Sequence, residues 1–355
     1  MSFEAGFVHN IDPVVGHVGP LPVYWYGLAY AIGFTGLLVW FWFRRRRLRL
    51  SESEPFDLCI LITLGVLLGA RAFDIVVYEW GYYRDHPAQL LSYWHGGMAS
   101  HGVLIGCALA LWIFCTWRRH PFLLMADEVV IPGAVFLALG RIGNFINAQI
   151  AGYPTDVWWG VKFPEFEEFR HPVALYESLK NLALVPILLM VSKRYPAGRG
   201  MLLAHFVFWY GFLRLFTDYY REYGSEFLGI GRGQYFNLLM ALIGLGLMWL
   251  MSRREPPKTA TEDLAVVEPG GASGLSLRLR QLVFLALVSF CLIIPSSWTQ
   301  DVFSESRKGE KQRQGVDDAR IGCLTMHVAL QSSATRNRLG SSSMGQSGDL
   351  PDATI

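Results

Sequence analysis

The sequence predicts an all-α membrane protein that crosses the bilayer seven times. Of its 355 residues, 52% are hydrophobic and only 17% are charged, whereas a soluble domain carries about 25% charged residues. The mean hydropathy is +0.30, although the C-terminal part of the chain is polar. This composition excludes a soluble globular enzyme, a disordered protein and a nucleic-acid-binding protein, and the formal net charge of +2 indicates no partner.

Seven apolar runs have the length of a membrane span, which needs about 20 mostly apolar residues. They comprise residues 22–43, 56–79, 98–117, 121–146, 173–191, 201–220 and 235–251. An eighth run, 281–298, is shorter and contains Pro295, so its insertion stays open. The first 19 residues lack the basic and apolar regions of a cleavable signal peptide, and we therefore expect the first run to be its own anchor.

Lysine and arginine are abundant in every second loop. They follow the first, third, fifth and seventh runs, beginning with the five arginines within 44–49, and the other short loops contain few. Because cytoplasmic loops are enriched in basic residues, we expect the N-terminus outside and the C-terminus inside. Residues 1–255 are expected to form one seven-span transmembrane domain, and residues 256–355 a polar, largely disordered cytoplasmic tail.

Ionisable side chains inside membrane spans are costly and usually mark a site. In the expected topology most of them fall in the outer half of the membrane, and Asp127, Glu128 and His205 fall towards the cytoplasmic end. The full set is Arg71, Asp74, His101, Asp127, Glu128, Arg141, Glu177, Lys180, His205, Arg214 and Asp218.

Residue spacing groups several of these side chains on common helix faces. Arg141 and Asn144 are separated by three positions, and Tyr210, Arg214 and Asp218 are spaced four apart, so each set shares a face. A cavity lined by these residues and His101 suits an anion, because the guanidinium group of arginine recognises phosphate through a planar set of donors. The anion expected at this depth is a phospholipid headgroup.

Local motifs are more specific than this general pattern. They are G-G-M-A-S-H-G over 96–102, G-R-I-G-N-F-I-N over 140–147 followed by Gly152, H-P-V-A-L-Y-E over 171–177, and Y-G-F-L-R over 210–214. Together with Tyr26 and residues 69–71, in the same order, they resemble the bacterial prolipoprotein diacylglyceryl transferase family over residues 15–255. The chain departs from that family at Gln149, where an acidic residue is common.

The resemblance implies a multi-pass protein of the bacterial cytoplasmic (inner) membrane with seven spans and its N-terminus outside. It also implies an enzyme that transfers the diacylglyceryl group of phosphatidylglycerol to the lipobox cysteine thiol of a preprolipoprotein and releases glycerol 1-phosphate. This is the first step of bacterial lipoprotein maturation. The implied partners are phosphatidylglycerol and signal-peptide-bearing preprolipoproteins in the membrane, with no nucleic acid.

This reaction suggests roles for particular residues. The cysteine reacts as a thiolate, and the departing phosphate gains negative charge. We assign Arg141 and Arg214 to the phosphate and His101 to the general base. We expect Tyr26 to orient the headgroup or assist proton transfer. The other expected phosphatidylglycerol-binding residues are Asn144, Tyr210, Glu177 and Gly152. The five cysteines show no metal-ligand spacing, so we expect no metal, and the alkylation needs no cofactor.

Two other functions stay open at this point. A transporter or channel uses buried charges along a path, but that path reaches both faces of the membrane, whereas the polar residues here are concentrated on one side. A non-catalytic phospholipid-binding paralogue binds lipid in the same cavity without turnover. For His101 and the two arginines, a purely structural role is the alternative to each functional assignment.

Overall fold

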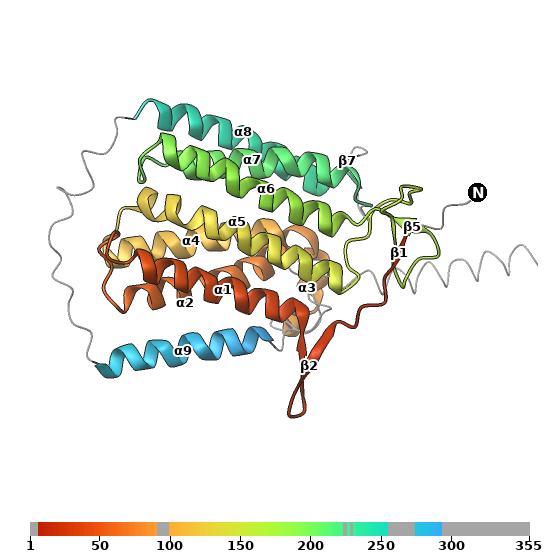
Figure 1. Ribbon diagram of the computed structural model, residues 1–355, viewed down its shortest axis with the longest axis horizontal. Helices are drawn as coiled ribbons and strands as arrows, with labels where there is room; N and C mark the ends of the chain where they lie inside the picture. The colour runs from red at the N-terminus through yellow and green to blue at the C-terminus, as the bar shows by residue number, and fades with distance from the viewer. Residues whose placement is uncertain (1–5, 91–98, 223–225, 228–229, 255–273, 293–355) are drawn as a thin grey trace, which may run out of the picture. The chain divides into compact units, whose positions relative to one another are not determined.

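The computed structural model describes residues 6–90, 99–222, 226–227, 230–254 and 274–292, and these residues are mostly helical (Figure 1). A long helix lies in each of the seven predicted apolar runs. These helices are α1 (Trp25–Arg44), α2 (Glu54–Phe73), α4 (Ser100–Arg118), α5 (Phe122–Ile146), α6 (Val173–Arg194), α7 (Met201–Tyr219) and α8 (Arg232–Ser252).

Within the described part of the chain, six helices are long and apolar enough to cross a membrane. They are α1, α2 with its continuation to Val77, α4, α5, α6 and α8. The helix predicted over 201–220 is present as α7, but it falls outside this set because His205, Arg214 and Asp218 lower its mean hydropathy. The charges that exclude α7 belong to the polar cluster described below.

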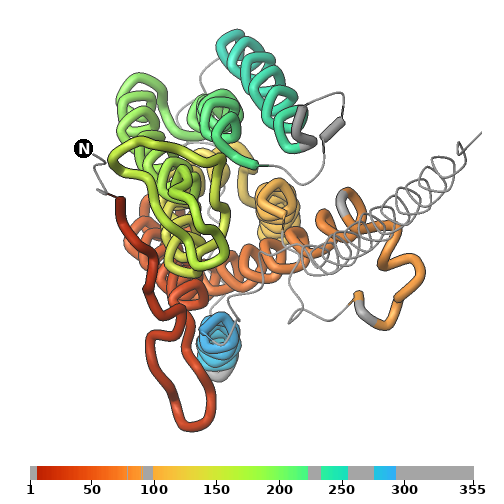
Figure 2. The backbone as a smooth tube through the Cα atoms, turned by 90° about the vertical axis from the view of Figure 1, so that its right-hand side faces the viewer, coloured from red at the N-terminus to blue at the C-terminus, as the bar shows by residue number. Residues whose placement is uncertain are grey.

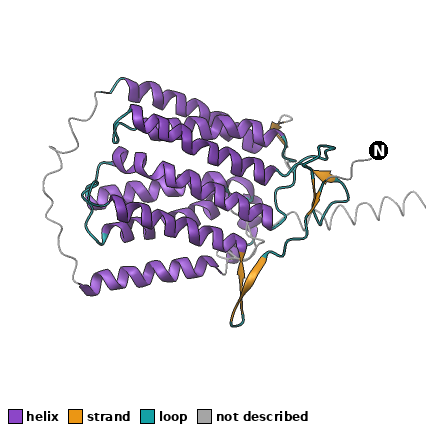
Figure 3. Ribbon diagram, viewed as in Figure 1, coloured by secondary structure: helices purple, strands orange, loops and turns teal. Residues whose placement is uncertain are grey.

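Short strands gather at one end of the helix bundle, where α1, α4, α6 and α8 begin (Figure 3). A three-stranded sheet has the order β1 (Phe7–Val8), β4 (Val161–Lys162) and β5 (Phe169–Arg170). Two hairpins are formed by β2 (Val14–Val18) with β3 (Leu21–Tyr24), and by β6 (Glu226–Phe227) with β7 (Ile230–Gly231). The all-α prediction misses these strands, because each has too few residues to produce a periodic pattern. We call this end of the bundle the strand end.

The opposite end of the bundle, where α1 ends and the basic cluster 44–49 lies, is called the arginine end. There Asp127 accepts hydrogen bonds from the backbone N–H groups of Gly200 and Leu203 at 2.9 and 3.0 Å, and so caps the start of α7. Glu128 pairs with Arg44 at 2.6 Å. The two carboxylates that the sequence separated from the other polar residues therefore lie away from the strand end and have structural partners.

Glycines bring α2 and α4 into direct backbone contact. A Cβ atom added to Gly106 would lie 1.9 Å from the carbonyl oxygen of Gly65, and one added to Gly102 would lie 2.3 Å from that of Gly69. No side chain fits at these positions, which is the packing expected of small residues spaced four apart on membrane helices. The contact holds the first turn of α4, and with it His101, against α2.

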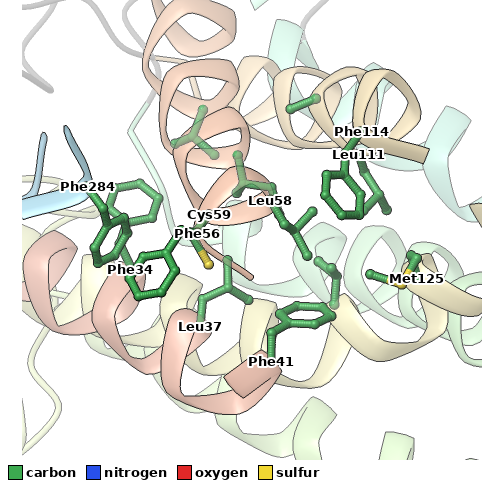
Figure 4. Packing of buried hydrophobic residues seen from close by; sticks show 14 of the residues in the cluster. Phe34, Leu37, Phe41, Phe56, Leu58, Cys59, Leu111, Phe114, Met125 and Phe284 are labelled. Carbon is green, nitrogen blue, oxygen red and sulfur yellow. The ribbon is translucent and has the colours of Figure 1, made fainter. Parts of the chain in front are cut away.

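Apolar side chains from α1, α2, α4 and α5 fill the core beside this contact. The largest of them are completely or almost completely shielded (Figure 4): Phe34, Phe41, Leu58, Phe114 and Met125. A second apolar cluster between α5, α6 and α7 includes Leu184, Leu188 and Phe206, and it ends at Tyr210. The helices around the polar cluster are therefore held rigidly by their apolar faces.

The last described helix, α9 (Gly274–Leu292), contains most of the eighth apolar run. It packs against α1 and α2, on the side of the bundle away from α8 (Figures 1 and 2). The remainder of that run, 293–298, lies outside the described residues, as do 255–273 and 299–355 of the predicted tail.

Candidate active site

Six helix ends meet at the strand end, and each contributes a polar side chain that is buried or, in the case of Arg141, 13% exposed. α1, α4, α6 and α8 contribute side chains from their first two turns, and α5 and α7 from their last two turns. The side chains are Tyr26, His101, Arg141, Glu177, Arg214, Asp218 and Asn237, and we call them the polar cluster. The structure brings the ionisable residues of this set together at one end of the helices.

Two arginines from different helices approach a single carboxylate. The Nε atom of Arg141 lies 2.7 Å from Oε2 of Glu177, and Nη1 of Arg214 lies 3.7 Å from the same oxygen. The Glu177 side chain has no exposed surface, and that of Arg214 is 3% exposed. Because an unpaired charge is very costly at such depth, the shared carboxylate compensates the charges of both guanidinium groups and holds them close together.

Arg214 has two further partners on its own helix. Its Nη1 donates to the Tyr210 hydroxyl at 2.9 Å, and its Nε lies 3.4 Å from Oδ2 of Asp218. The predicted face of Tyr210, Arg214 and Asp218 is therefore confirmed. These contacts fix the plane of the guanidinium group, and a planar group in a fixed orientation can present paired donors to a phosphate.

Arg141 is held by the segment that follows α5. Its Nη1 donates to Oδ1 of Asn144 at 3.3 Å, and Nδ2 of Asn144 donates to Oε1 of Gln149 at 2.9 Å. Ala148 and Ile150 have φ angles of +55° and +61°, a region that non-glycine residues rarely occupy. These two left-handed residues turn the chain so that the Gln149 side chain lies back against the end of the helix.

A hydrogen-bonded chain links His101 to the arginines. Nδ2 of Asn237 donates to Oδ2 of Asp218, and Oδ1 of Asn237 lies 3.2 Å from Nε2 of His101. A carboxylate only accepts hydrogen bonds, so the amide nitrogen faces Asp218 and the amide oxygen faces the imidazole. His101 therefore donates through Nε2–H, and in the neutral ring Nδ1 carries the free lone pair.

Tyr26 lies beside the G-R-I-G-N-F-I-N motif, residues 140–147. Its hydroxyl is 2.9 Å from that of Tyr30, and its ring is almost completely buried. A Cβ atom added to Gly143 would lie 3.0 Å from the ring of Tyr26, so this glycine lets α5 approach α1 closely. The Tyr26 hydroxyl lies near Arg141 and Asn144, so Tyr26 belongs to the polar cluster.

Lys180 is a cation to which the sequence analysis gave no role. It lies one turn from Glu177 on the same face of α6, it is 6% exposed, and its Nζ is 4.1 Å from the centre of the Tyr210 ring. Within the described residues its ammonium group has no hydrogen-bond acceptor. Together with Arg141 and Arg214 it places three basic side chains around the two carboxylates Glu177 and Asp218.

An apolar cavity lies beneath the polar cluster. Its volume is about 170 Å³, and its described walls come from α1, α2, α4, α5, α7 and α8. Leu137 lies one turn before Arg141, Phe206 one turn before Tyr210, and Val103 two residues after His101; the lining includes Leu137, Phe206, Val103, Phe34 and Phe136. A group with an anionic head and an apolar chain therefore matches the cluster and the cavity together.

Gly152 lies in the segment between α5 and α6, against the end of α7. A Cβ atom there would be 2.3 Å from the carbonyl oxygen of Tyr220, and the Gly152 N–H donates to the carbonyl of His171 at 2.9 Å. The contacts with Tyr220 and His171 explain why a side chain does not fit at Gly152.

Burial lowers the pKa of His171. This favours the neutral imidazole beside the Tyr176 hydroxyl, which is 2.9 Å away.

Asn237, Lys180 and Gln149 are the members of this region that the sequence reasoning missed or left without a role. Asn237 is a neutral amide, so it is not among the ionisable side chains that mark a site inside a span. Lys180 was counted, but its spacing from Glu177 alone did not show which neighbouring helix it faces. A search for every strongly polar side chain inside an apolar run finds both residues.

These features define a polytopic helical membrane protein with a cation-rich buried site above an apolar cavity. The chain belongs to the prolipoprotein diacylglyceryl transferase family, whose sequence profile matches residues 13–250. The family resemblance inferred from the motifs is confirmed, and α9 lies beyond the matched segment.

Several relatives are named phosphatidylglycerol–prolipoprotein diacylglyceryl transferase. One from Legionella pneumophila is 37% identical over 249 residues, which cover 68% of this chain and 97% of that protein. One from Cupriavidus metallidurans is 35% identical over 266 residues, covering 71% and 97%. One from Nitrosomonas europaea is 37% identical over 268 residues, covering 71% and 94%.

Proposed function

We propose that this protein transfers the diacylglyceryl group of phosphatidylglycerol to the lipobox cysteine of preprolipoproteins, forming a thioether and releasing glycerol 1-phosphate. The observation that carries this proposal is the approach of Arg141 and Arg214, on separate helices, to one buried carboxylate above an apolar cavity. Family membership and the names of the relatives support the same reaction.

The charge of the site suits a phosphodiester. Three cations surround two carboxylates, Glu177 and Asp218, so one bound monoanion balances the charges. Arg141 and Arg214 bind the phosphate oxygens, and Asn144 and Tyr210 keep the guanidinium groups in place. The acyl chains then extend into the apolar cavity, which places the glyceryl carbon at the boundary between the two regions.

The reaction forms one bond and breaks another. The cysteine sulfur attacks the glyceryl carbon, the C–S bond forms, and the bond from that carbon to the phosphate oxygen breaks. The phosphate changes from a monoanion to a more strongly charged monoester, so the arginines bind it more tightly in the transition state than in the bound lipid. Interactions that strengthen in this way accelerate the chemical step.

The thiol proton requires an acceptor near the sulfur. Asn237 accepts the Nε2–H of His101, which leaves the Nδ1 lone pair of the neutral imidazole to accept this proton. The Asp218 carboxylate, bonded to Asn237, favours the imidazolium that results. Tyr26 assists by orienting the headgroup beside Asn144.

We further propose that all seven helices α1, α2 and α4–α8 span the inner membrane, with the strand end outside. The polar cluster compensates the charges that lower the hydropathy of α7, since they face protein instead of lipid. The basic cluster 44–49 at the arginine end then faces the cytoplasm. The lipid and the signal helix of the preprolipoprotein reach the site sideways from the outer half of the membrane.

The activity is tested with the purified full-length protein in phosphatidylglycerol liposomes and a synthetic lipobox peptide. We expect mass spectrometry to detect a thioether-linked diacylglyceryl peptide and glycerol 1-phosphate. The controls are a peptide with serine in place of the cysteine, and liposomes of phosphatidylcholine alone. Saturable phosphatidylglycerol binding without any thioether product would identify a lipid-binding paralogue and reject the transferase.

A further inference from the structure

We infer that α9 crosses the membrane as a span additional to the family's matched segment, running from the arginine end to the strand end. The matched family profile ends at residue 250, before this helix begins. The inference rests on the contacts of α9 with α1 and α2, and it does not depend on the proposed enzymatic activity.

One end of α9 is attached at the arginine end of the bundle. Nε of Arg280 lies 2.6 Å from Oδ1 of Asp57, in the first turn of α2. The other oxygen of Asp57 pairs with Arg118, in the last turn of α4, and Arg280 also donates to Ser276. A buried carboxylate is thus shared between α4 and α9, which fixes where α9 begins its path along the bundle.

Apolar contacts continue along the helix. One turn after Arg280, Phe284 is 6% exposed and meets the edge of Phe56, with ring centroids 6.3 Å apart. Figure 4 shows Phe284 inserted beside Phe56 and Phe34, with the core residues of α1 and α2 behind it. α9 is therefore integrated into the packed core of the bundle.

The other end of α9 reaches the strand end. Cys291 is completely buried, and a Cβ atom added to Gly27 would lie 2.2 Å from the Cys291 carbonyl oxygen. Gly27 lies in the first turn of α1, directly after Tyr26. α9 thus runs antiparallel to α1, from the end where α2 begins to the end where α1 begins.

α9 is not among the six helices counted above as long and apolar enough to cross a membrane, but its length and its free face agree with a span. Nineteen residues of α-helix extend about 28 Å, close to the roughly 30 Å of the hydrocarbon core. The outward face is apolar and 44–63% exposed at Leu279, Leu282, Leu285 and Phe290. Arg278 and Arg280 lie at the arginine end, where basic residues of the other helices also gather. A helix lying on the membrane surface would not connect Asp57 with Gly27.

Cysteine accessibility in spheroplasts tests this inference. Cys323 follows α9 in the sequence, and the other four cysteines lie in helices. Two reference variants in a Cys323→Ser background report the two ends: His17→Cys on the exposed β2–β3 hairpin, and Glu52→Cys in the exposed segment before α2. A membrane-impermeant maleimide is applied to intact spheroplasts and again after lysis, and the full-length chain is analysed.

We expect native Cys323 and His17→Cys to become labelled under the same condition, either in intact spheroplasts or only after lysis. Glu52→Cys is expected to become labelled under the other condition. Because both references are measured, this expectation holds whichever end faces outward. Labelling of Cys323 together with Glu52→Cys would overturn the inference, since α9 would then return to the arginine end. If Cys323 stays unlabelled after lysis, Ser332→Cys and Ser343→Cys in the Cys323→Ser background decide between the same two outcomes.

Discussion

Arg141 Nε lies 2.7 Å from Oε2 of Glu177, a carboxylate without exposed surface that reaches it from another helix. Arg214 lies 3.7 Å from the same oxygen. An isolated ion pair of this kind gives weak net stabilisation, because removing both charges from water costs several kcal/mol per ion, about as much as their attraction returns. An arrangement that gains little stability by itself is well suited to receive an anionic ligand, which supplies the arginines with additional acceptors.

Replacement of Arg141 by lysine is expected to abolish most activity although the charge is kept. Lysine is a point charge on a flexible stem and cannot bond Glu177, Asn144 and a phosphate through one planar group. We expect Arg141→Lys and Arg141→Ala both to lower kcat/KM by about 10²–10³-fold, the loss typical of one transition-state donor. The measurement is thioether formation at varied phosphatidylglycerol concentration.

The matched control is Arg119→Lys, because Arg119 is exposed at the arginine end, and this variant is expected to retain the parent rate. Arg214→Lys is expected to behave like Arg141→Lys, since Tyr210 and Asp218 orient its guanidinium group. Full activity of Arg141→Lys would show that paired donors are not required at this position.

His101 is expected to control the acidic limb of the pH–rate profile. The imidazole accepts a proton only when neutral, so kcat/KM falls as the pH drops below the pKa of its imidazole. His101→Asn is expected to lower kcat by about 10²–10⁴-fold, the usual contribution of a general base, and to remove this limb. Asn237→Ala, which removes the acceptor of Nε2–H, is expected to lower kcat while keeping the limb.

An unchanged acidic limb in His101→Asn would assign the base to another group. Lipid binding by both variants, measured in liposomes, separates a loss of chemistry from a loss of the folded site.

Lys180 is expected to contribute to lipid affinity through its charge. It is the third basic group beside Glu177, and no described group accepts a hydrogen bond from its ammonium. Lys180→Met keeps the apolar stem, so we expect KM for phosphatidylglycerol to rise about tenfold, equivalent to ~1.4 kcal/mol, with little change in kcat. Lys180→Arg is expected to recover most of the affinity.

The control for this prediction is Lys193→Met, because Lys193 is exposed in the last turn of the same helix. An unchanged KM in Lys180→Met, with Lys193→Met also unchanged, would show that the bound lipid does not sense this charge.

The glycine contact between α2 and α4 is expected to dominate the stability of this part of the fold. A methyl group on Gly106 would meet the Gly65 carbonyl oxygen at 1.9 Å, and the helices separate to admit it. Overpacking of this kind costs about 1–3 kcal/mol, so Gly106→Ala is expected to lower the thermal midpoint in detergent and to displace His101.

Gly36→Ala is the matched control. It lies inside α1, and an added Cβ atom meets nothing within 4 Å. Its thermal midpoint is expected to equal or exceed that of the parent, because alanine favours the helix by about 0.8–1.0 kcal/mol over glycine. A Gly106→Ala protein as stable as Gly36→Ala would contradict the close contact.

The amino-acid sequence alone determined where the helices lie and which side chains share an end of them. The apolar run 121–146 became the helix Phe122–Ile146, because a backbone without water satisfies its own hydrogen bonds most readily as a helix. The G-R-I-G-N-F-I-N motif also identified the family before any contact was known.

Contacts between helices depended on how each helix is rotated and on which helices become neighbours. The pairing of Arg141 with Glu177, the link from His101 through Asn237 to Asp218, and the place of Lys180 over Tyr210 all join residues on different helices. Helical periodicity predicts a face but not its neighbour. The tertiary structure decided these pairs, because the glycine contacts and apolar cores that rotate the helices act between segments far apart in the sequence.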